Sequence, residues 1–192
     1  MRNVELVIAV NDGSTDDSVS KIFINENVIV LNEPENRGKG FALRKGFTKA
    51  VELGCDAVIT LDADLQHNPA SIPALLSGLD NFDLVLGNRL KDLSGMPFQR
   101  VMSNKLTSFL LSKKTGMKII DSQCGFRALS VEVLQKVQTQ SNGYEAESEI
   151  IILAARAGFK IGFVEVPTIY GNEKSKVNPV KAIFGFIKVL FY

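Results

Sequence analysis

A short apolar run that ends in two closely spaced carboxylates constrains this chain most. Residues 57–61 are partly β-branched and few in number, which is typical of a buried strand. Asp62 and Asp64 follow at once, and Pro69 is placed to open a helix. In an open α/β sheet, ligands bind at the carboxyl ends of the strands. The stretch therefore predicts a strand, a ligand-binding loop and a helix, in that order.

The same alternation of strand and helix patterns continues along the chain. Strands are expected over residues 4–10, 27–31, 57–61, 82–86 and 159–166. Helices are expected from about residue 40 to 53, over 69–79, 100–114 and 131–137, from about residue 143, and over 177–192. Short connections between such elements predict an α/β fold with a mostly parallel sheet and helices on both of its faces.

The composition excludes several classes of protein. The 192 residues are 45% hydrophobic and 22% charged, which fits one folded domain rather than a disordered chain. A net charge of +1 argues against a nucleic-acid partner. Cys55 and Cys124 give neither a disulfide framework nor a zinc spacing, so we expect reduced thiols and a cytoplasmic location. We expect no signal peptide and no membrane-spanning helix.

The Asp-x-Asp motif at residues 62–64 suggests a metal site. Two carboxylates one residue apart are unfavourable neighbours unless a cation lies between them. Gln66 adds a further oxygen ligand close by, and Mg²⁺ and Mn²⁺ prefer oxygen ligands. The functional interpretation is a Mg²⁺ or Mn²⁺ site formed by Asp62, Asp64 and Gln66 that holds a diphosphate. The alternative is that these acids only cap a strand end or a helix.

Polar groups also follow the first two expected strands. Asp12 could accept hydrogen bonds from a nucleobase or a ribose, or it could be a turn or cap acid. In the segment 36–40, glycines allow a ligand to approach the backbone, and a helix N-terminus attracts anions. Lys39 adds positive charge there. The spacing matches neither the P-loop nor the dinucleotide fingerprint.

Two further segments carry cations. Arg89 and Arg100 flank a loop over residues 90–97 and could both bind a phosphate, or they could form a solvated rim. The segment 177–192 is apolar on most sides and too short to span a bilayer. It predicts either an amphipathic helix at a membrane surface or a core or oligomer helix.

Taken together, these motifs resemble those of family 2 glycosyltransferases with the GT-A fold. The likeness is closer to the polyprenyl-phosphate sugar transferases, the group that includes dolichol-phosphate mannosyltransferase. It covers about residues 4–179 and rests on six segments in the family's order, at residues 11–16, 36–40, 62–67, 87–89, 121–127 and 175–176.

The resemblance implies a role for each matching residue. Asp12 resembles the acid that contacts the nucleotide base, and Lys39 lies on the same, nucleotide-binding side. Asp62 and Asp64 resemble the pair that meets the nucleotide sugar and its metal, with Gln66 as a third ligand. The implied acceptor-binding residues are Arg89, Arg100, Ser175 and Lys176; the last two end a loop that closes over the site, where Lys174 replaces an arginine of the related enzymes.

The implied reaction is a metal-dependent, inverting transfer of a sugar from a UDP- or GDP-sugar to a dolichyl or undecaprenyl phosphate. An acceptor phosphate is already an anion and needs no general base. The expected catalytic residues are then Asp64, Arg89, Arg100 and Lys174. A hydroxyl acceptor, such as a growing polysaccharide, is the alternative and would need a base. Candidates for that base are Asp121, Glu145 and Glu147.

The resemblance also implies a domain organisation. Residues 1–176 would form the GT-A domain and residues 177–192 a C-terminal amphipathic helix, which suggests peripheral membrane contact. Related sequences begin one strand and one helix earlier, so we expect an N-terminally short domain. An exposed sheet edge there would favour a homo-oligomer. A third interpretation is a non-catalytic binding or assembly module.

Overall fold

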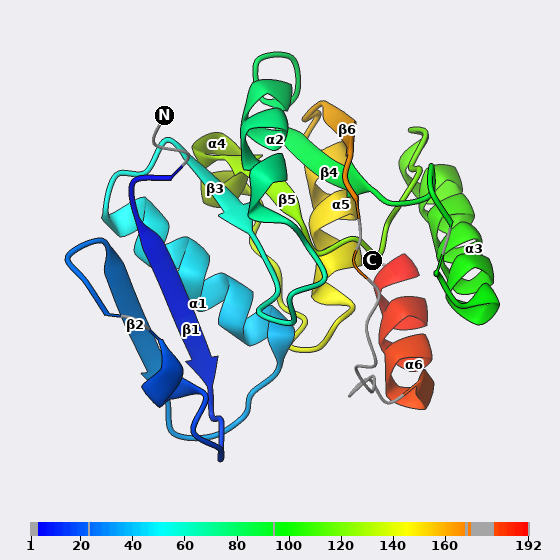
Figure 1. Cartoon of the computed structure of the whole chain (residues 1–192). Coiled ribbons are helices and arrows are strands. Elements are labelled where there is room, and N and C mark those ends of the chain that lie inside the picture. Colours follow the sequence, from blue (N-terminus) through cyan, green and yellow to red (C-terminus); the bar gives the residue numbers. More distant parts are fainter. Residues whose placement is uncertain (1–3, 23, 94, 168, 170–178, 192) are drawn as a thin grey trace.

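The computed structural model describes residues 4–22, 24–93, 95–167, 169 and 179–191, in which strands and helices alternate (Figure 1). The strands are β1 (Val7–Asp12), β2 (Val28–Glu33), β3 (Ala57–Thr60), β4 (Leu84–Asn88), β5 (Arg127–Ser130) and β6 (Ile161–Glu165). The helices are α1 (Lys39–Glu52), α2 (Ile72–Gly78), α3 (Phe98–Thr115), α4 (Val131–Lys136), α5 (Ala146–Arg156) and α6 (Pro179–Leu190). Short 3₁₀ helices lie at Val19–Lys21 and Pro69–Ser71.

The described strands form two sheets. In the smaller sheet β1 and β2 are parallel, with Val7 opposite Val28. The larger sheet has the order β3-β5-β4-β6. Strands β4 and β6 are parallel, and β5 runs antiparallel to both of its neighbours. The expected α/β class is confirmed, and the larger sheet is mixed because of β5.

Strand β5 is the strand that the sequence pattern did not predict. It begins with a charged residue and its four residues are too few to show a period. The structure nevertheless buries Arg127, Ala128 and Leu129 to 1%, 0% and 1% exposure. The guanidinium of Arg127 is satisfied there because it donates to three main-chain carbonyl oxygens. Such partners leave no signal in a single sequence.

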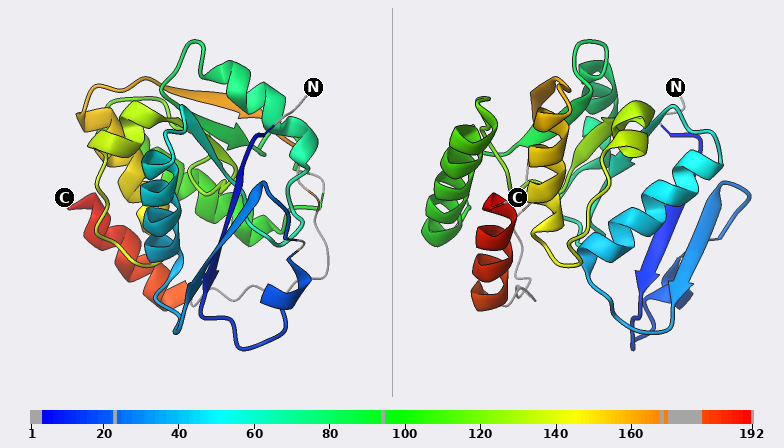
Figure 2. Two further views of the ribbon diagram at one scale, coloured as in Figure 1. Left: turned by 90° about the vertical axis from the view of Figure 1, so that its left-hand side faces the viewer. Right: turned by 180° about the vertical axis from the view of Figure 1, so that it is seen from behind.

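Helices cover both faces of the larger sheet, as expected. In β4, Val85 faces one core cluster while Leu84 and Leu86 face the other, as the two-residue period of a strand requires. Helix α2 packs on the side of Val85. Helices α4 and α5, with part of α1, pack on the opposite side, which faces the viewer in the right-hand view of Figure 2.

Several helix boundaries differ from the prediction, and the helix expected from about residue 143 begins at Ala146 as α5. The helix expected over residues 69–79 is a 3₁₀ turn followed by α2, and the side chain of Asn68 caps this turn by accepting a hydrogen bond from the main-chain N of Ala70 at 2.9 Å. Helix α3 begins at Phe98, two residues before the predicted start, and ends before Gly116, whose φ of 70° only glycine adopts readily.

Helices α3 and α6 lie side by side at one end of the molecule (Figures 1 and 2). Both pack against α5. The C-terminal helix predicted over residues 177–192 is present as α6, while residues 177, 178 and 192 lie outside the described part of the chain. Among the described residues, none forms part of a helix with both the length and the apolar character needed to cross a membrane.

Candidate active site

A tight turn after β3 carries the Asp-x-Asp motif. Oδ1 of Asp64 accepts a hydrogen bond from the main-chain N of Gln66 at 3.1 Å. Leu65 between them has a φ of 61°, in the left-handed region that a leucine rarely adopts. The turn thus keeps the carboxylate of Asp64 next to Gln66. Both residues offer oxygen atoms of the kind that hard divalent cations bind.

Asp62 belongs to an ion cluster rather than to this turn. Nζ of Lys39 lies 2.9 Å from Oδ2 of Asp62 and 3.1 Å from Oε1 of Glu147. Burial by itself lowers the pKa of Lys39, but the carboxylates of Glu147 and Asp62 outweigh it and raise the pKa above its ordinary value. The lysine at the start of α1 therefore stays charged and occupies one oxygen of the first acid in the motif.

Gly125 covers this cluster. A Cβ on Gly125 would lie 2.7 Å from Oδ2 of Asp62 and 3.1 Å from Nζ of Lys39. The carbonyl oxygen of Gly125 accepts a hydrogen bond from Oγ1 of Thr60, the last residue of β3, at 2.6 Å. The loop before β5 and the end of β3 are thereby fixed together, and only a residue without a side chain fits between them and the ion cluster.

Asp12 organises the loop that leads into α1. Its two carboxylate oxygens accept hydrogen bonds from the main-chain N of Arg37 at 2.8 Å and of Gly38 at 2.7 Å. Gly38 has a φ of 103°, and a Cβ there would collide with the carbonyl oxygen of Asn142. Within the described chain, Asp12 thus binds main-chain N–H groups of the loop before α1, as a turn acid does, and turn or cap acid was the alternative that the sequence left open.

Arg89, at the end of β4, is held by a buried acid. Nε of Arg89 donates to Oδ2 of Asp121 at 2.9 Å, and Nη2 donates to Oδ1 at 2.9 Å. Asp121 is 0% exposed. Burial alone would raise the pKa of Asp121, but the hydrogen bonds and charge of Arg89, with help from Asn104, hold it below its ordinary value. The pair is therefore ionised.

His67 lies near both the acidic turn and the pair of Arg89 and Asp121. It is 6% exposed, and its ring packs against that of Phe126 with centroids 5.3 Å apart. Burial lowers its pKa, and the charge of Arg89 lowers it further, against weaker opposing effects of Asp62, Asp64 and Asp121. The imidazole is therefore neutral at pH 7. Its Nδ1 has no hydrogen-bond partner among the described residues.

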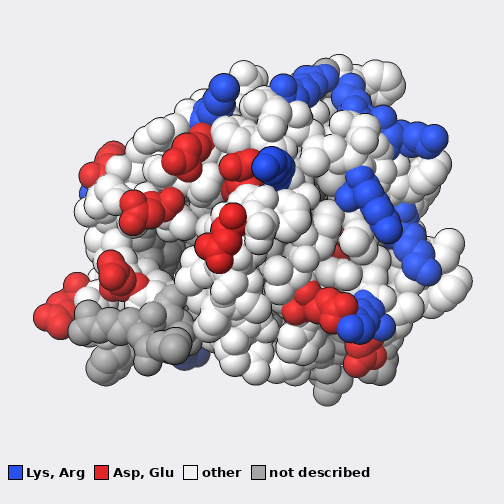
Figure 3. All heavy atoms as spheres, turned by 90° about the horizontal axis from the view of Figure 1, so that it is seen from above, with Lys and Arg blue, Asp and Glu red and all other residues white. Residues whose placement is uncertain are grey.

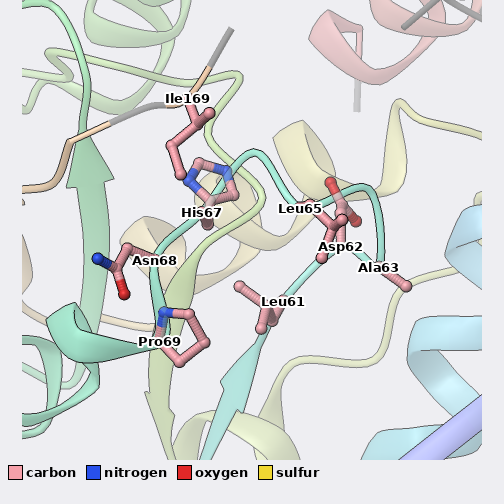
Figure 4. Close-up of a pocket in the computed structure, with 8 residues that line it drawn as sticks. All are labelled: Leu61, Asp62, Ala63, Leu65, His67, Asn68, Pro69 and Ile169. Carbon is pink, nitrogen blue, oxygen red and sulfur yellow. The ribbon is translucent and has the colours of Figure 1, made fainter. Parts of the chain in front are cut away.

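A pocket of about 410 Å³ opens beside this histidine (Figure 4). The main-chain N of Ile169 donates to the carbonyl oxygen of Gln66 at 2.9 Å, which brings the segment after β6 against the acidic turn. Most residues that line the pocket are apolar. The lining residues are Leu61, Asp62, Ala63, Leu65, His67, Asn68, Pro69 and Ile169.

The structure brings together some of the predicted site residues and leaves others apart. Asp62, Asp64 and Arg89 all lie close enough to His67 to affect its pKa. Arg100 is exposed in the first turn of α3. Lys174, Ser175 and Lys176 lie outside the described residues. Within those residues no three His, Cys, Asp or Glu side chains are grouped to hold a metal ion.

Sequence reasoning missed Asn104, which is 1% exposed and donates to Oδ1 of Asp121 at 2.6 Å. A signal for it exists. Asn104, Ser108 and Ser112 recur at a spacing of four within α3, and this places three polar residues on one side of the helix. On a helix that packs against a core, such a row indicates a buried hydrogen-bond network.

Solved structures share the fold of this chain. A crystal structure of glucosyl-3-phosphoglycerate synthase from Mycobacterium tuberculosis, in complex with Mn²⁺, UDP and glucosyl-3-phosphoglycerate, superposes with a TM-score of 0.70 and 22% sequence identity. The match covers 98% of this chain and 68% of that one. The architecture is therefore that of the GT-A glycosyltransferases.

The sequence comparisons give the family. The model of glycosyl transferase family 2 matches residues 3–138, so the chain belongs to this family and is a glycosyltransferase. An uncharacterized protein of Methanocaldococcus jannaschii is 36% identical over 192 residues, covering 96% of this chain and 78% of its own.

Two relatives have named activities. The UDP-N-acetylglucosamine–dolichyl-phosphate N-acetylglucosaminyltransferase of Methanococcus voltae is 33% identical, covering 96% of this chain and 82% of its own length. The undecaprenyl-phosphate mannosyltransferase of Micrococcus luteus is 30% identical, with 83% and 67% covered. The family resemblance that the motifs implied is confirmed.

Proposed function

We propose that this glycosyltransferase transfers a sugar, with inversion, from a nucleotide diphosphate sugar to a polyprenyl phosphate. The names of the relatives from M. voltae and M. luteus support a polyprenyl phosphate acceptor. The observation that carries the proposal is the pairing of the buried acids with cations. Asp121 is bound to Arg89, and Glu147 is bound to Lys39. Neither is placed to remove a proton from a hydroxyl group.

This pairing separates the two kinds of acceptor. A hydroxyl acceptor needs a general base whose pKa lies near the working pH. The pKa of Asp121 is instead held below its ordinary value by Arg89. The third candidate, Glu145, accepts a hydrogen bond from the main-chain N of Gly143 at 3.1 Å, next to its own helix. An anionic phosphate needs no base, and it matches the arginine at this end of the sheet.

The donor diphosphate would lie between α1 and the acidic turn. Lys39 and the N-terminus of α1 attract anions, and Asp12 holds the loop that leads there. Asp64 and Gln66 would bind a Mg²⁺ or Mn²⁺ ion together with the diphosphate, because such ions use one or two carboxylates and substrate phosphates. Asp62 would keep Lys39 in place beside them. When bound, the ion would neutralise the charge that builds on the leaving diphosphate.

On the acceptor side, Arg89 and Arg100 would bind the lipid phosphate, with Lys174, Ser175 and Lys176 from the segment before α6. An oxygen of that phosphate attacks the anomeric carbon of the sugar. The bond from this carbon to the diphosphate oxygen breaks, and the diphosphate leaves with its electron pair. Positioning the phosphate in line with that bond is the main task of the arginines.

The outer surface of α3 and α6 supports a lipid acceptor. The two helices, with the residue that follows α6, expose a set of large apolar side chains, which we call the apolar face: Phe98, Met102, Leu106, Phe109, Val180, Ile183, Phe184, Ile187 and Phe191. Neither helix contains an acidic residue. On the side of the molecule seen in Figure 3, Lys and Arg side chains gather toward the right, where α3 lies in Figure 1. Apolar side chains fringed by cations favour the surface of an anionic membrane.

The experiment that tests the proposal is calorimetric titration of UDP and of GDP into the protein, with and without Mn²⁺. We expect metal-dependent binding of one nucleotide and its loss in Asp64→Ala. The matched control is Asp56→Ala, which removes an exposed acid before the other end of β3. Binding of neither nucleotide, or equal binding in Asp64→Ala, would contradict the proposed donor site and favour a non-catalytic module.

A further inference from the structure

A buried network links Arg89 to helix α3. Besides its two bonds from the guanidinium, Asp121 accepts a hydrogen bond from the main-chain N of Arg89 at 3.0 Å. Nδ2 of Asn104, from α3, donates to Oδ1 of Asp121 at 2.6 Å. The main-chain N of Gln123 donates to the same oxygen at 3.2 Å. Both carboxylate oxygens are therefore held from several directions.

Asn104 is itself fixed by its neighbours. Its Oδ1 accepts a hydrogen bond from Oγ of Ser108 at 3.0 Å. Oγ of Ser108 in turn accepts a hydrogen bond from the main-chain N of Ser122 at 3.0 Å. Asn104, Ser108 and Ser122 are all 3% exposed or less. In a low-dielectric interior, a fully connected set of such bonds holds its members in one arrangement.

Fixing an arginine in this way has a consequence for ligand binding. An unrestrained arginine side chain carries rotamer entropy, which a ligand must overcome when it orders the side chain. Asp121 has already ordered that of Arg89, since the carboxylate sets the plane of the guanidinium through Nε and Nη2. The guanidinium is thus oriented before any ligand arrives.

We propose that Asp121 is the positioning residue for Arg89, and that Asn104 of α3 positions Asp121, so that the guanidinium is aimed at the acceptor phosphate. This rests on the proposed function, in which Arg89 binds that phosphate. Neither Asp121 nor Asn104 touches the substrates in this scheme. Their effect is on the affinity for the phosphate, transmitted through Arg89.

The competing explanation is that the network only fastens α3 to the rest of the molecule. The same side of α3 offers a matched control. Oγ of Ser112 accepts a hydrogen bond from the main-chain N of Ile119 at 2.9 Å and donates to the carbonyl oxygen of Ser108 at 2.7 Å. Ser112→Ala removes this attachment of α3 without removing any partner of Asp121.

The test is titration of farnesyl phosphate, a short polyprenyl phosphate, into the protein in the presence of UDP and Mn²⁺, with UDP titration as the donor-side measurement. In Asp121→Asn and in Asn104→Leu we expect farnesyl phosphate to bind about tenfold more weakly. The affinity for UDP should stay the same in both variants. Ser112→Ala should lower the melting temperature and leave both affinities unchanged.

Unchanged farnesyl phosphate affinity in the Asp121 and Asn104 variants would overturn the proposal. So would a loss that Ser112→Ala shares, because it would show a purely structural role. If Asp121→Asn does not fold, Asn104→Leu decides, since it keeps the ion pair of Asp121 and Arg89. Arg89→Gln tests the phosphate-binding role of Arg89 separately from the positioning role of Asp121. If it binds farnesyl phosphate as the wild type does, the role of Arg89 is wrong, while UDP binding still judges the donor site independently.

Discussion

The two sheets of this protein differ in how deeply they are buried. In the larger sheet, Leu84, Val85 and Leu86 of β4 are 0% exposed, and β5 is nearly as inaccessible. In the smaller sheet, every residue of β1 and β2 is at least partly exposed. Helix α1 packs against β1, and the described core clusters contain no residue of β1 or β2.

This difference divides the proposed site into two parts. Arg89 follows β4 and is fixed by the buried Asp121, so this part of the acceptor side rests on the more deeply buried sheet. Asp12 ends β1, and Lys39 begins α1 after β2, so this part of the donor side rests on the smaller sheet, while Asp64 follows β3 of the larger one. Regions with few buried apolar contacts open at lower free energy. Arg89 on the acceptor side is therefore preorganised, and the part of the donor side carried by β1 and α1 gains more order from its ligand.

The largest effect is expected at the buried ion pair. Replacing one partner of such a pair costs about 3–5 kcal/mol, because the other charge stays buried without compensation. Asp121→Asn should lower the free energy of unfolding at pH 7 by about this amount, measured by urea denaturation. A single buried carboxylate would then account for a large part of the free energy of unfolding.

The pH dependence of this loss follows from the pKa of Asp121, which lies below its unfolded value of 3.8. A carboxyl group with a depressed pKa contributes stability that is fully present above the unfolded value and is lost as pH falls through the folded one. Wild type and Asp121→Asn should thus differ most at neutral pH and converge below pH 3.8. A difference that stays constant down to pH 2 would contradict the ionised pair.

A pair of truncations compares the sheets directly. Leu86→Ala in β4 removes a fully buried side chain and should cost about 2–5 kcal/mol through lost burial and a residual cavity. Ile8→Ala in β1 removes a half-buried one and should cost about 1 kcal/mol. Urea denaturation of both variants measures the difference. Equal losses would show that the smaller sheet carries as much of the stability as the larger one.

The sequence predicted the elements whose signal is local. The apolar runs before Asp12 and Asp62 became β1 and β3, and the glycine-rich opening of α1 was placed within two residues. Strand β5 was missed because its partners are distant in sequence. In the fold, Leu129 pairs with Leu84 of β4, and Ala128 pairs with Ile59 of β3. No local sequence pattern records such pairings.

The site shows the same limit. The motifs identified the acids and arginines, but not how they pair. Lys39 binds Asp62, which is 23 residues away in the sequence, and Arg89 binds Asp121, which is 32 residues away. These segments meet only in the fold. Asn104 lies on the buried side of α3, which carries the apolar Val101 and Leu111 as well as the polar Ser108. The apolar pattern predicts the buried side of this helix but does not predict which polar residues lie on it.

Hydrogen exchange should show the donor side tightening on binding. With UDP and Mn²⁺ at a hundred times the dissociation constant, the amides of β1 and of the first turn of α1 should gain about 2.7 kcal/mol of protection, because their opening destroys the site. Amides of α6 that exchange by local fraying serve as the control and should not change. Equal slowing in α6, or none in β1, would contradict the division of the site into two parts.

A small effect on ligand binding is expected at Lys39, where the donor side meets the core. Lys39→Gln removes a cation that both Asp62 and Glu147 keep charged, and it should weaken UDP binding about tenfold, close to 1.4 kcal/mol. The control is Lys49→Gln in the last turn of the same helix, whose lysine pairs with Glu52 at 3.1 Å and should leave UDP affinity unchanged. Farnesyl phosphate affinity should stay constant in both variants, since Arg89 keeps its partner. A loss of farnesyl phosphate binding in Lys39→Gln would show that the two sides form one cooperative unit rather than a rigid acceptor side and a ligand-ordered donor side.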